Sequence, residues 1–166
     1  MQYRWSHRRL LAAAVSSLVL SGAALADDTA NLTVTATVAP SCQLTSAPTL
    51  GFGTLTPLAN NDAQANITWA CTSGFNTVIK LGGGGSGSIS GRTMLSGATP
   101  LAYQLYTSAA RTTVFGDGTT GNTMAVAGAG YSNPGTTTVY GRVLQANAGA
   151  APAGAYSDTV QITIVF

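Results

Sequence analysis

The sequence predicts an all-β sandwich, and three observations carry this prediction. Apolar and polar side chains alternate along several short runs, which is typical of strands with one buried face. Threonine and valine suit strands, and clusters of Gly, Asn, Asp and Pro between the runs suit turns. Helical periodicity is nearly absent, and Lys, Arg, Asp and Glu together make up only 7% of the 166 residues. So few charges disfavour a helical bundle.

The first 26 residues have the organisation of a secretory signal peptide. Arg4, Arg8 and Arg9 form a positive start, residues 10–20 are apolar, and Ala24-Leu25-Ala26 matches a cleavage site. The apolar stretch is short for a membrane span, although an uncleaved anchor remains the alternative. Removing 1–26 takes three of seven basic residues away, so the mature net charge is 4 − 5 = −1.

The composition of the mature chain argues against catalysis. It contains neither histidine nor glutamate, which supply most general acids, general bases and zinc ligands. Clustered cations that would contact nucleic-acid phosphates are also missing from the sequence. We therefore expect no enzyme activity, no catalytic residue, no metal, no cofactor and no nucleic-acid partner.

Cys42 and Cys71 are the only cysteines of the chain. In an exported protein, two cysteines most simply form one disulfide, and their spacing is not that of a C-x-x-C redox pair. We expect a structural disulfide between them, with Trp69 packed in the core nearby.

The expected strands follow one another along the mature chain. They are the alternating or apolar runs at 32–38, 63–69, 75–81, 101–105, 139–143 and 156–166. Residues 82–91, 116–122 and 147–154 are rich in glycine and small polar residues and are interpreted as flexible connections. Arg111 and Asp158 are isolated charges, interpreted as structural side chains that pair with each other.

The two terminal runs need partners for their backbones and their apolar faces. In one interpretation they pair within the same sandwich. In the other, one terminus serves a neighbouring molecule.

Several fragments, in this order and spacing, carry a family resemblance over residues 29–166. They are Cys42, Leu50-Gly51-Phe52-Gly53, Cys71, Leu101-Ala102-Tyr103-Gln104-Leu105-Tyr106, Ala109-Ala110-Arg111-Thr112 and the terminal run from Gly154 to Phe166. The chain resembles the spore coat U domain family, which includes subunits of archaic (Csu-type) chaperone–usher pili.

The resemblance implies an incomplete immunoglobulin-like β-sandwich that a donor strand from a partner completes. It also implies a structural pilin that polymerises by donor-strand exchange for surface adhesion and biofilm formation. The implied partners are neighbouring pilin subunits, a periplasmic chaperone and an outer-membrane usher. The chain would be exported through the periplasm to an extracellular pilus.

The resemblance also assigns roles to the two terminal runs. The donor strand would use Leu32, Val34, Ala36 and Val38, within an N-terminal extension at 27–39. The acceptor groove and the surface recognised by the chaperone would use Val160, Ile162, Ile164 and Phe166. The sandwich domain itself would span 40–166, with Pro40 interrupting the ladder at its start.

Two other functions are compatible with the sequence. The protein could be a secreted, self-complete sandwich that binds carbohydrate through its tyrosines. It could also be a spore or cell-envelope coat component of the same fold.

Overall fold

The computed structural model of the chain describes residues 27–46 and 48–166. The signal peptide expected over 1–26 lies outside the described residues. Residues 37–166 form one compact unit, and residues 27–36 do not belong to it.

Within the compact unit the described elements are almost all strands, as the alternating runs predicted. In chain order they are β1 (Cys42–Leu44), β2 (Asn61–Cys71), β3 (Asn76–Leu81), the 3-10 turn η1 (Gly84–Ser86), β4 (Thr93–Ser96), β5 (Thr99–Ala102), β6 (Gln104–Tyr106), β7 (Met124–Ala127), β8 (Gly135–Val143), the helix α1 (Gln145–Ala150) and β9 (Ile162–Val165).

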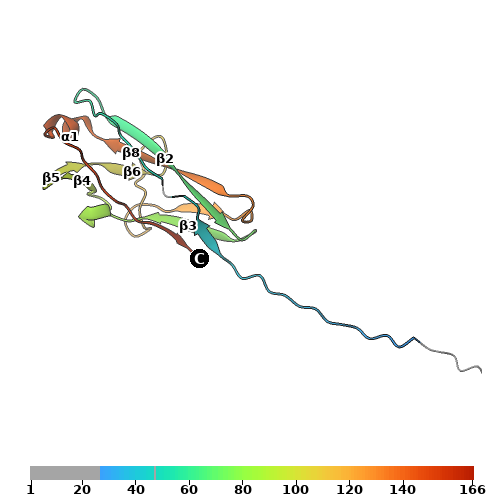
Figure 1. Cartoon of the computed structure of the whole chain (residues 1–166). Coiled ribbons are helices and arrows are strands. Elements are labelled where there is room, and N and C mark those ends of the chain that lie inside the picture. The colour runs from blue at the N-terminus through green and yellow to red at the C-terminus, as the bar shows by residue number, and fades with distance from the viewer. Residues whose placement is uncertain (1–26, 47) are drawn as a thin grey trace, which may run out of the picture. The chain divides into compact units, whose positions relative to one another are not determined.

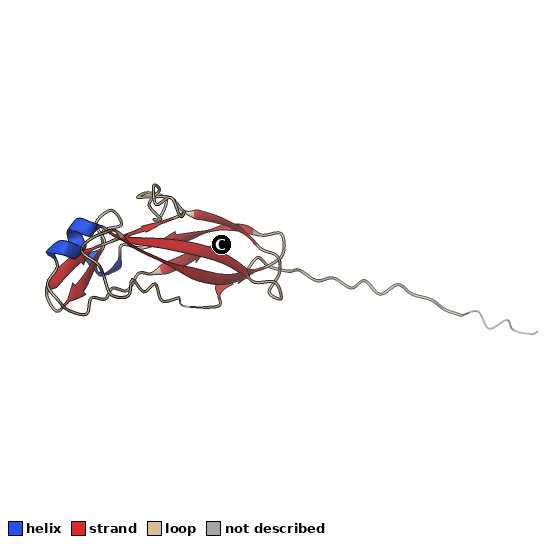
Figure 2. Ribbon diagram, turned by 90° about the horizontal axis from the view of Figure 1, so that it is seen from above, coloured by secondary structure: helices blue, strands red, loops and turns tan. Residues whose placement is uncertain are grey.

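Two antiparallel sheets share one apolar core. The first has the strand order β1-β2-β8-β6, and the second has the order β7-β3-β9. Figures 1 and 2 show the strands of the compact unit from two directions. The strands β4 and β5 form a separate hairpin. Buried residues from both sheets pack together, among them Ile67 of β2, Val139 of β8, Ile79 of β3 and Val126 of β7. The molecule is therefore a sandwich of two open sheets.

The pairing of β2 with β8 is the longest ladder of the fold. It runs antiparallel from Asn61 opposite Val143 to Trp69 opposite Gly135. Ile67, Trp69 and Cys71 share the buried face of β2, because side chains alternate between the two faces of a strand. The run expected at 63–69 is thus confirmed as a strand.

Three expectations about chain segments differ from the structure. The run expected as a strand at 156–166 forms a strand only in β9, Ile162–Val165, and pairs before it only through an isolated bridge at Ser157. The alternating run at 101–105 is not one strand. It divides at Tyr103, because β5 pairs with β4 while β6 pairs with β8. Part of the stretch at 147–154, expected to be a flexible connection, lies in α1. Alanine favours helix strongly, and Pro152 cannot continue one.

The expected disulfide is present. Cys42 and Cys71 lie opposite each other in the β1–β2 ladder, and their sulfur atoms are 2.05 Å apart. Trp69 is also buried in the core, as expected, and its indole N–H donates to the hydroxyl of Thr137 at 3.1 Å. The disulfide joins β1 to the centre of the first sheet.

The charges on the outer face of this sheet pair differently from the expectation. Arg142 of β8 donates two hydrogen bonds, of 2.7 and 2.8 Å, to Asp62 of β2. Arg111 lies 3.3 Å from the same carboxylate and 5.7 Å from the ring centroid of Tyr140. The predicted pairing of Arg111 with Asp158 is therefore wrong. Arg111 lies beside Asp62, which is the cross-strand partner of Arg142.

Acid is expected to weaken the folded state partly through Asp62. The hydrogen bond from Arg142 lowers the pKa of Asp62 below its ordinary value of 3.8. The stability that this ion pair contributes is fully present above pH 3.8, the ordinary pKa of an aspartate. It is lost as the pH falls through the lower pKa that Asp62 has in the folded protein. We expect the loss to be less than about 1 kcal/mol, because the pair is partly exposed. Urea unfolding at pH 7 and pH 2.5 measures it, and Asp62→Asn should remove this part of the pH dependence.

The leader, residues 27–39, carries no helix or strand in the described chain. Its apolar side chains are exposed: Leu32 is 87%, Val34 81% and Val38 80% exposed. A strand needs a hydrogen-bonding partner, and the proposed partner is a second molecule. The assignment of this run as a donor strand therefore stays a prediction.

Among the described residues, no helix has the length and apolarity needed to cross a membrane.

Candidate functional site: an apolar groove between two chain segments

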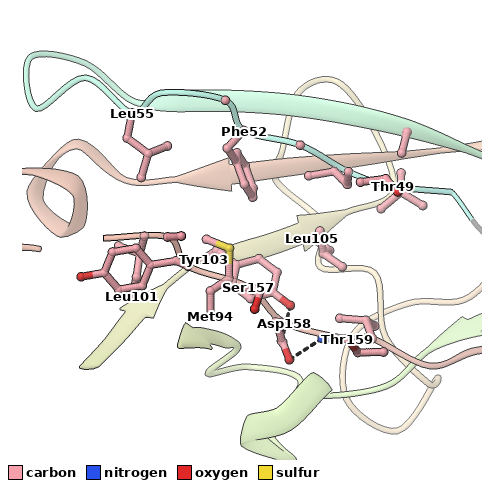
Figure 3. Close-up of a pocket in the computed structure, with 18 of the residues that line it drawn as sticks. Thr49, Phe52, Leu55, Met94, Leu101, Tyr103, Leu105, Ser157, Asp158 and Thr159 are labelled. Atoms are coloured by element: carbon pink, nitrogen blue, oxygen red, sulfur yellow. Dashed lines mark hydrogen bonds between the residues drawn. The ribbon is translucent and has the colours of Figure 1, made fainter. Parts of the chain in front are cut away.

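The compact unit has a groove of about 980 Å³. Well-packed protein interiors hold few voids larger than a water molecule, so a hollow of this size marks an incomplete core. Two long segments form its walls, residues 48–55 on one side and residues 151–162 on the other. Figure 3 shows Thr49, Phe52 and Leu55 from the first wall and Ser157 to Thr159 from the second.

Strands of both sheets and of the β4–β5 hairpin form the apolar floor of the groove. The floor residues include Ala65 and Ile67 of β2, Leu81 of β3, Leu101 of β5, Leu105 of β6 and Val139 of β8. Tyr103, between β5 and β6, also lines the floor. Its ring packs edge to face against the ring of Phe52 in the first wall, with 6.3 Å between the two ring centroids. The groove thus opens directly onto the core of the sandwich.

The backbone of the first wall has no ladder partner. Within residues 27–46 and 48–166, none of residues 48–55 makes a backbone-to-backbone hydrogen bond. The wall is held instead by side chains such as Leu50 and Phe52, which pack against the core. Its N–H and C=O groups are therefore available to another strand, since exposed edges can add one.

The second wall is paired along one edge only. It continues into β9, where Ile162, the last residue of the wall, lies opposite Leu81, and Val165 lies opposite Val78 of β3. In the described sheets β9 has no neighbour on its other side. Two edges that can each accept hydrogen bonds therefore border the groove.

The four predicted acceptor residues lie in different places. Val160 and Ile162 line the groove and also pack against the core. Ile164 packs against the core beyond the cavity, and Phe166, 64% exposed, lies outside it. The role of all four in chaperone recognition stays a prediction.

Sequence reasoning missed the first wall and most of the floor. Residues 48–55 show no strict alternation, so strand periodicity did not mark them. The fragment Leu50-Gly51-Phe52-Gly53 carries a usable signal, because it places two large apolar residues in a glycine-rich stretch.

The polar groups of the groove gather around Asp158. The hydroxyl of Tyr103 donates to one carboxylate oxygen of Asp158 at 2.6 Å, and the N–H of Gly85 donates to the other at 2.7 Å. Burial, followed by the bond to Asp158, raises the pKa of Tyr103. At neutral pH this tyrosine is therefore an uncharged hydrogen-bond donor.

A fully buried arginine lies beneath the same region. The guanidinium of Arg92 donates to the carbonyls of Gly82 and Phe115, at 2.7 and 2.8 Å, and to the side chain of Gln104 at 2.6 Å. Burial lowers the pKa of Arg92, while nearby Tyr103 and Asp158 oppose that shift. These hydrogen bonds hold the backbone at Gly82 and Phe115 in place. Among the described residues, no group of three His, Cys, Asp or Glu could hold a metal ion.

Comparisons with known proteins agree with this geometry. One solved structure is the CsuC–CsuE chaperone–tip adhesion subunit pre-assembly complex from archaic chaperone–usher Csu pili of Acinetobacter baumannii. It matches with a TM-score of 0.54 and 20% identity, over 78% of this chain and 40% of the matched chain. The similarity confirms the predicted fold, an incomplete immunoglobulin-like sandwich. The chain spans about two fifths of that structure's matched chain.

No curated protein matches the sequence. The family model of the Spore Coat Protein U domain matches residues 28–163, which is most of the chain. The protein therefore belongs to the Spore Coat Protein U domain family.

Proposed function

We propose that this protein is a structural pilus subunit that polymerises by donor-strand exchange. The leader of one copy, with Leu32, Val34, Ala36 and Val38, enters the groove of the next copy. The observation that carries the proposal is the groove itself, an apolar hollow bordered by two backbone edges with unused hydrogen-bonding capacity.

The chemistry of the leader matches that of the groove. Leu32, Val34 and Val38 are exposed in the single chain, and burying each fully would contribute about 1.5–3 kcal/mol. Their neighbours Thr33, Thr35 and Thr37 would face away from the apolar floor, because alternate residues of a strand point to opposite faces. A shift by one residue would place the threonines in the groove, so the apolar floor disfavours that shift.

The geometry of exchange determines the form of the assembly. The leader and the groove are different surfaces, so each copy can donate to one neighbour and accept from another. Such a head-to-tail contact does not close on itself and produces a filament. Neighbouring copies of this chain, or of related pilins, are the permanent partners in this proposal.

Assembly would need a temporary partner for the open groove. A periplasmic chaperone would supply a strand before exchange, and an outer-membrane usher would be the place of exchange. The similarity to a chaperone–subunit complex of a Csu pilus supports the first of these partners. The finished pilus would lie outside the cell and act in adhesion and biofilm formation. No catalytic step enters this role, and the structural character of the family supports a protein that is not an enzyme.

Expression of the mature chain with and without a chaperone of this class tests the proposal. A subunit with an open groove should give little soluble protein alone and should be recovered as a one-to-one complex with the chaperone. Released from the complex, it should form filaments visible by electron microscopy. A stable, filament-free monomer obtained without the chaperone would contradict the proposal, and glycan binding by that monomer would support the carbohydrate-binding alternative.

A further inference from the structure

The second wall of the groove has an interruption in its strand pairing. At Ser157 the wall pairs with Leu95 of β4 through two backbone bonds of 2.9 and 3.0 Å. At Gln161 it changes partner, where the N–H of Gly82 donates to the carbonyl of Gln161 at 2.9 Å. Residues 158–160 between these points belong to no strand, yet they line the groove.

The side chain of Asp158 spans this interruption. One carboxylate oxygen accepts the N–H of Gly85, in the loop between β3 and β4, and the N–H of Thr159, each at 2.7 Å. The other oxygen accepts the Tyr103 hydroxyl from the groove floor. One carboxylate thereby ties the wall to the neighbouring loop and to the floor, where no ladder exists to do so.

The loop fits closely around this carboxylate. A Cβ atom at Gly84 would collide with the side chain of Asp158, and one at Gly85 would approach it to 3.2 Å. Arg92 fixes the start of the same loop through the carbonyl of Gly82. The glycines of this connection therefore have a packing role beside their role as turn residues.

We propose that Asp158 is a positioning residue for strand capture: its carboxylate holds residues 158–161 extended, so that their free edge is ready to pair with the incoming leader. The inference rests on the proposed function. Without the carboxylate, this stretch must be ordered during capture, and ordering backbone costs free energy that slows association. The expected effect is a slower capture by a molecule that remains folded.

Capture is measured on the mature chain carrying Val34→Asp, whose own leader cannot donate, after its release from the complex with the chaperone. The probe is a fluorescent peptide of residues 27–40 of this chain, and its association rate is followed by anisotropy. A urea unfolding curve for each variant identifies the folded fraction, so that rates are compared per folded molecule. Failure of this parent chain to capture the peptide would count against the proposed function itself.

Two matched pairs of variants test the role of Asp158. Asp158→Ala should slow capture about tenfold, the usual scale for losing hydrogen bonds to a charged group. Asp117→Ala is the control, because Asp117 also accepts two backbone N–H bonds, from Thr119 and Thr120, but lies outside the groove lining. Asp158→Asn, which retains an oxygen for the N–H of Gly85, should recover capture to within about threefold of the parent.

The second pair leaves the carboxylate in place. Gly84 and Gly87 share a φ of 68°, but only Gly84 contacts Asp158, and an added Cβ at Gly87 meets nothing within 4 Å. Alanine costs similar backbone strain at both positions, so only Gly84→Ala should slow capture. The comparison of Gly84→Ala with Gly87→Ala therefore tests the role of Asp158 in capture even if Asp158→Ala does not fold.

The inference is overturned if Asp158→Ala and Gly84→Ala capture the peptide within twofold of the parent. Equal slowing by Gly84→Ala and Gly87→Ala would also overturn it, because loop strain would then be the cause. In either case the parent would still capture the peptide, and the proposed function would stand.

Discussion

Replacing Val34 by aspartate is expected to abolish filament formation while leaving a folded subunit. In the proposed exchange, Val34 is buried in the groove of a neighbour, whose floor is apolar. The change removes about 1.5–3 kcal/mol of burial and places a carboxylate in an apolar site, which costs several kcal/mol more. Together these terms exceed about 4 kcal/mol, so the association should weaken by about a thousandfold or more. Sedimentation of the released subunit measures the loss.

Thr35→Asp is the matched control for this substitution. Thr35 is the next residue of the same leader and would face away from the groove floor. Its carboxylate should remain in water, so filaments should form much as in the unmodified protein. Normal filaments from Val34→Asp, or equal loss from both variants, would contradict the donor register.

Replacing Cys42 and Cys71 by alanine is expected to produce the second large effect. The disulfide closes a loop with a sequence separation of 29 residues, for which chain entropy suggests about 3–4 kcal/mol of stabilisation. A domain of this size has a total unfolding free energy of only about 5–15 kcal/mol. The closed loop contains residues 48–55, the groove wall without backbone pairing. The variant should therefore lose stability and capture the leader peptide poorly.

Urea unfolding of the oxidised protein and of the alanine variant measures this loss. Dithiothreitol should lower the midpoint of the natural chain toward that of the variant and leave the variant itself unchanged. An unaltered midpoint in the variant would mean that the ladder between β1 and β2 holds the wall without the disulfide.

The sandwich could be predicted from sequence because its long strands each bury one face. Ala63, Ala65, Ile67 and Trp69 alternate with Gln64, Asn66 and Thr68 along β2, and Ile67 and Trp69 are buried in the structure. The disulfide followed from two cysteines behind an export signal. These features depend on local periodicity and on residue counts, both of which a single sequence contains.

The features that were not predicted depend on contacts between distant segments. Asp158 binds Tyr103 and Gly85, which lie far from it in the chain. Arg92 is the largest fully buried side chain, and nothing in its sequence surroundings distinguishes it from a surface residue. The wall at 48–55 has no ladder partner in its own molecule, so it lacks the alternation that a paired strand would show.

The structure of the assembled filament, determined by electron cryo-microscopy, tests the central claim most directly. Residues 31–38 of each copy should form a strand between β9 and residues 48–55 of the next copy, with Val34 toward the floor and Thr35 toward solvent. A filament in which these residues occupy the groove of their own molecule, or lie outside any groove, would contradict the account.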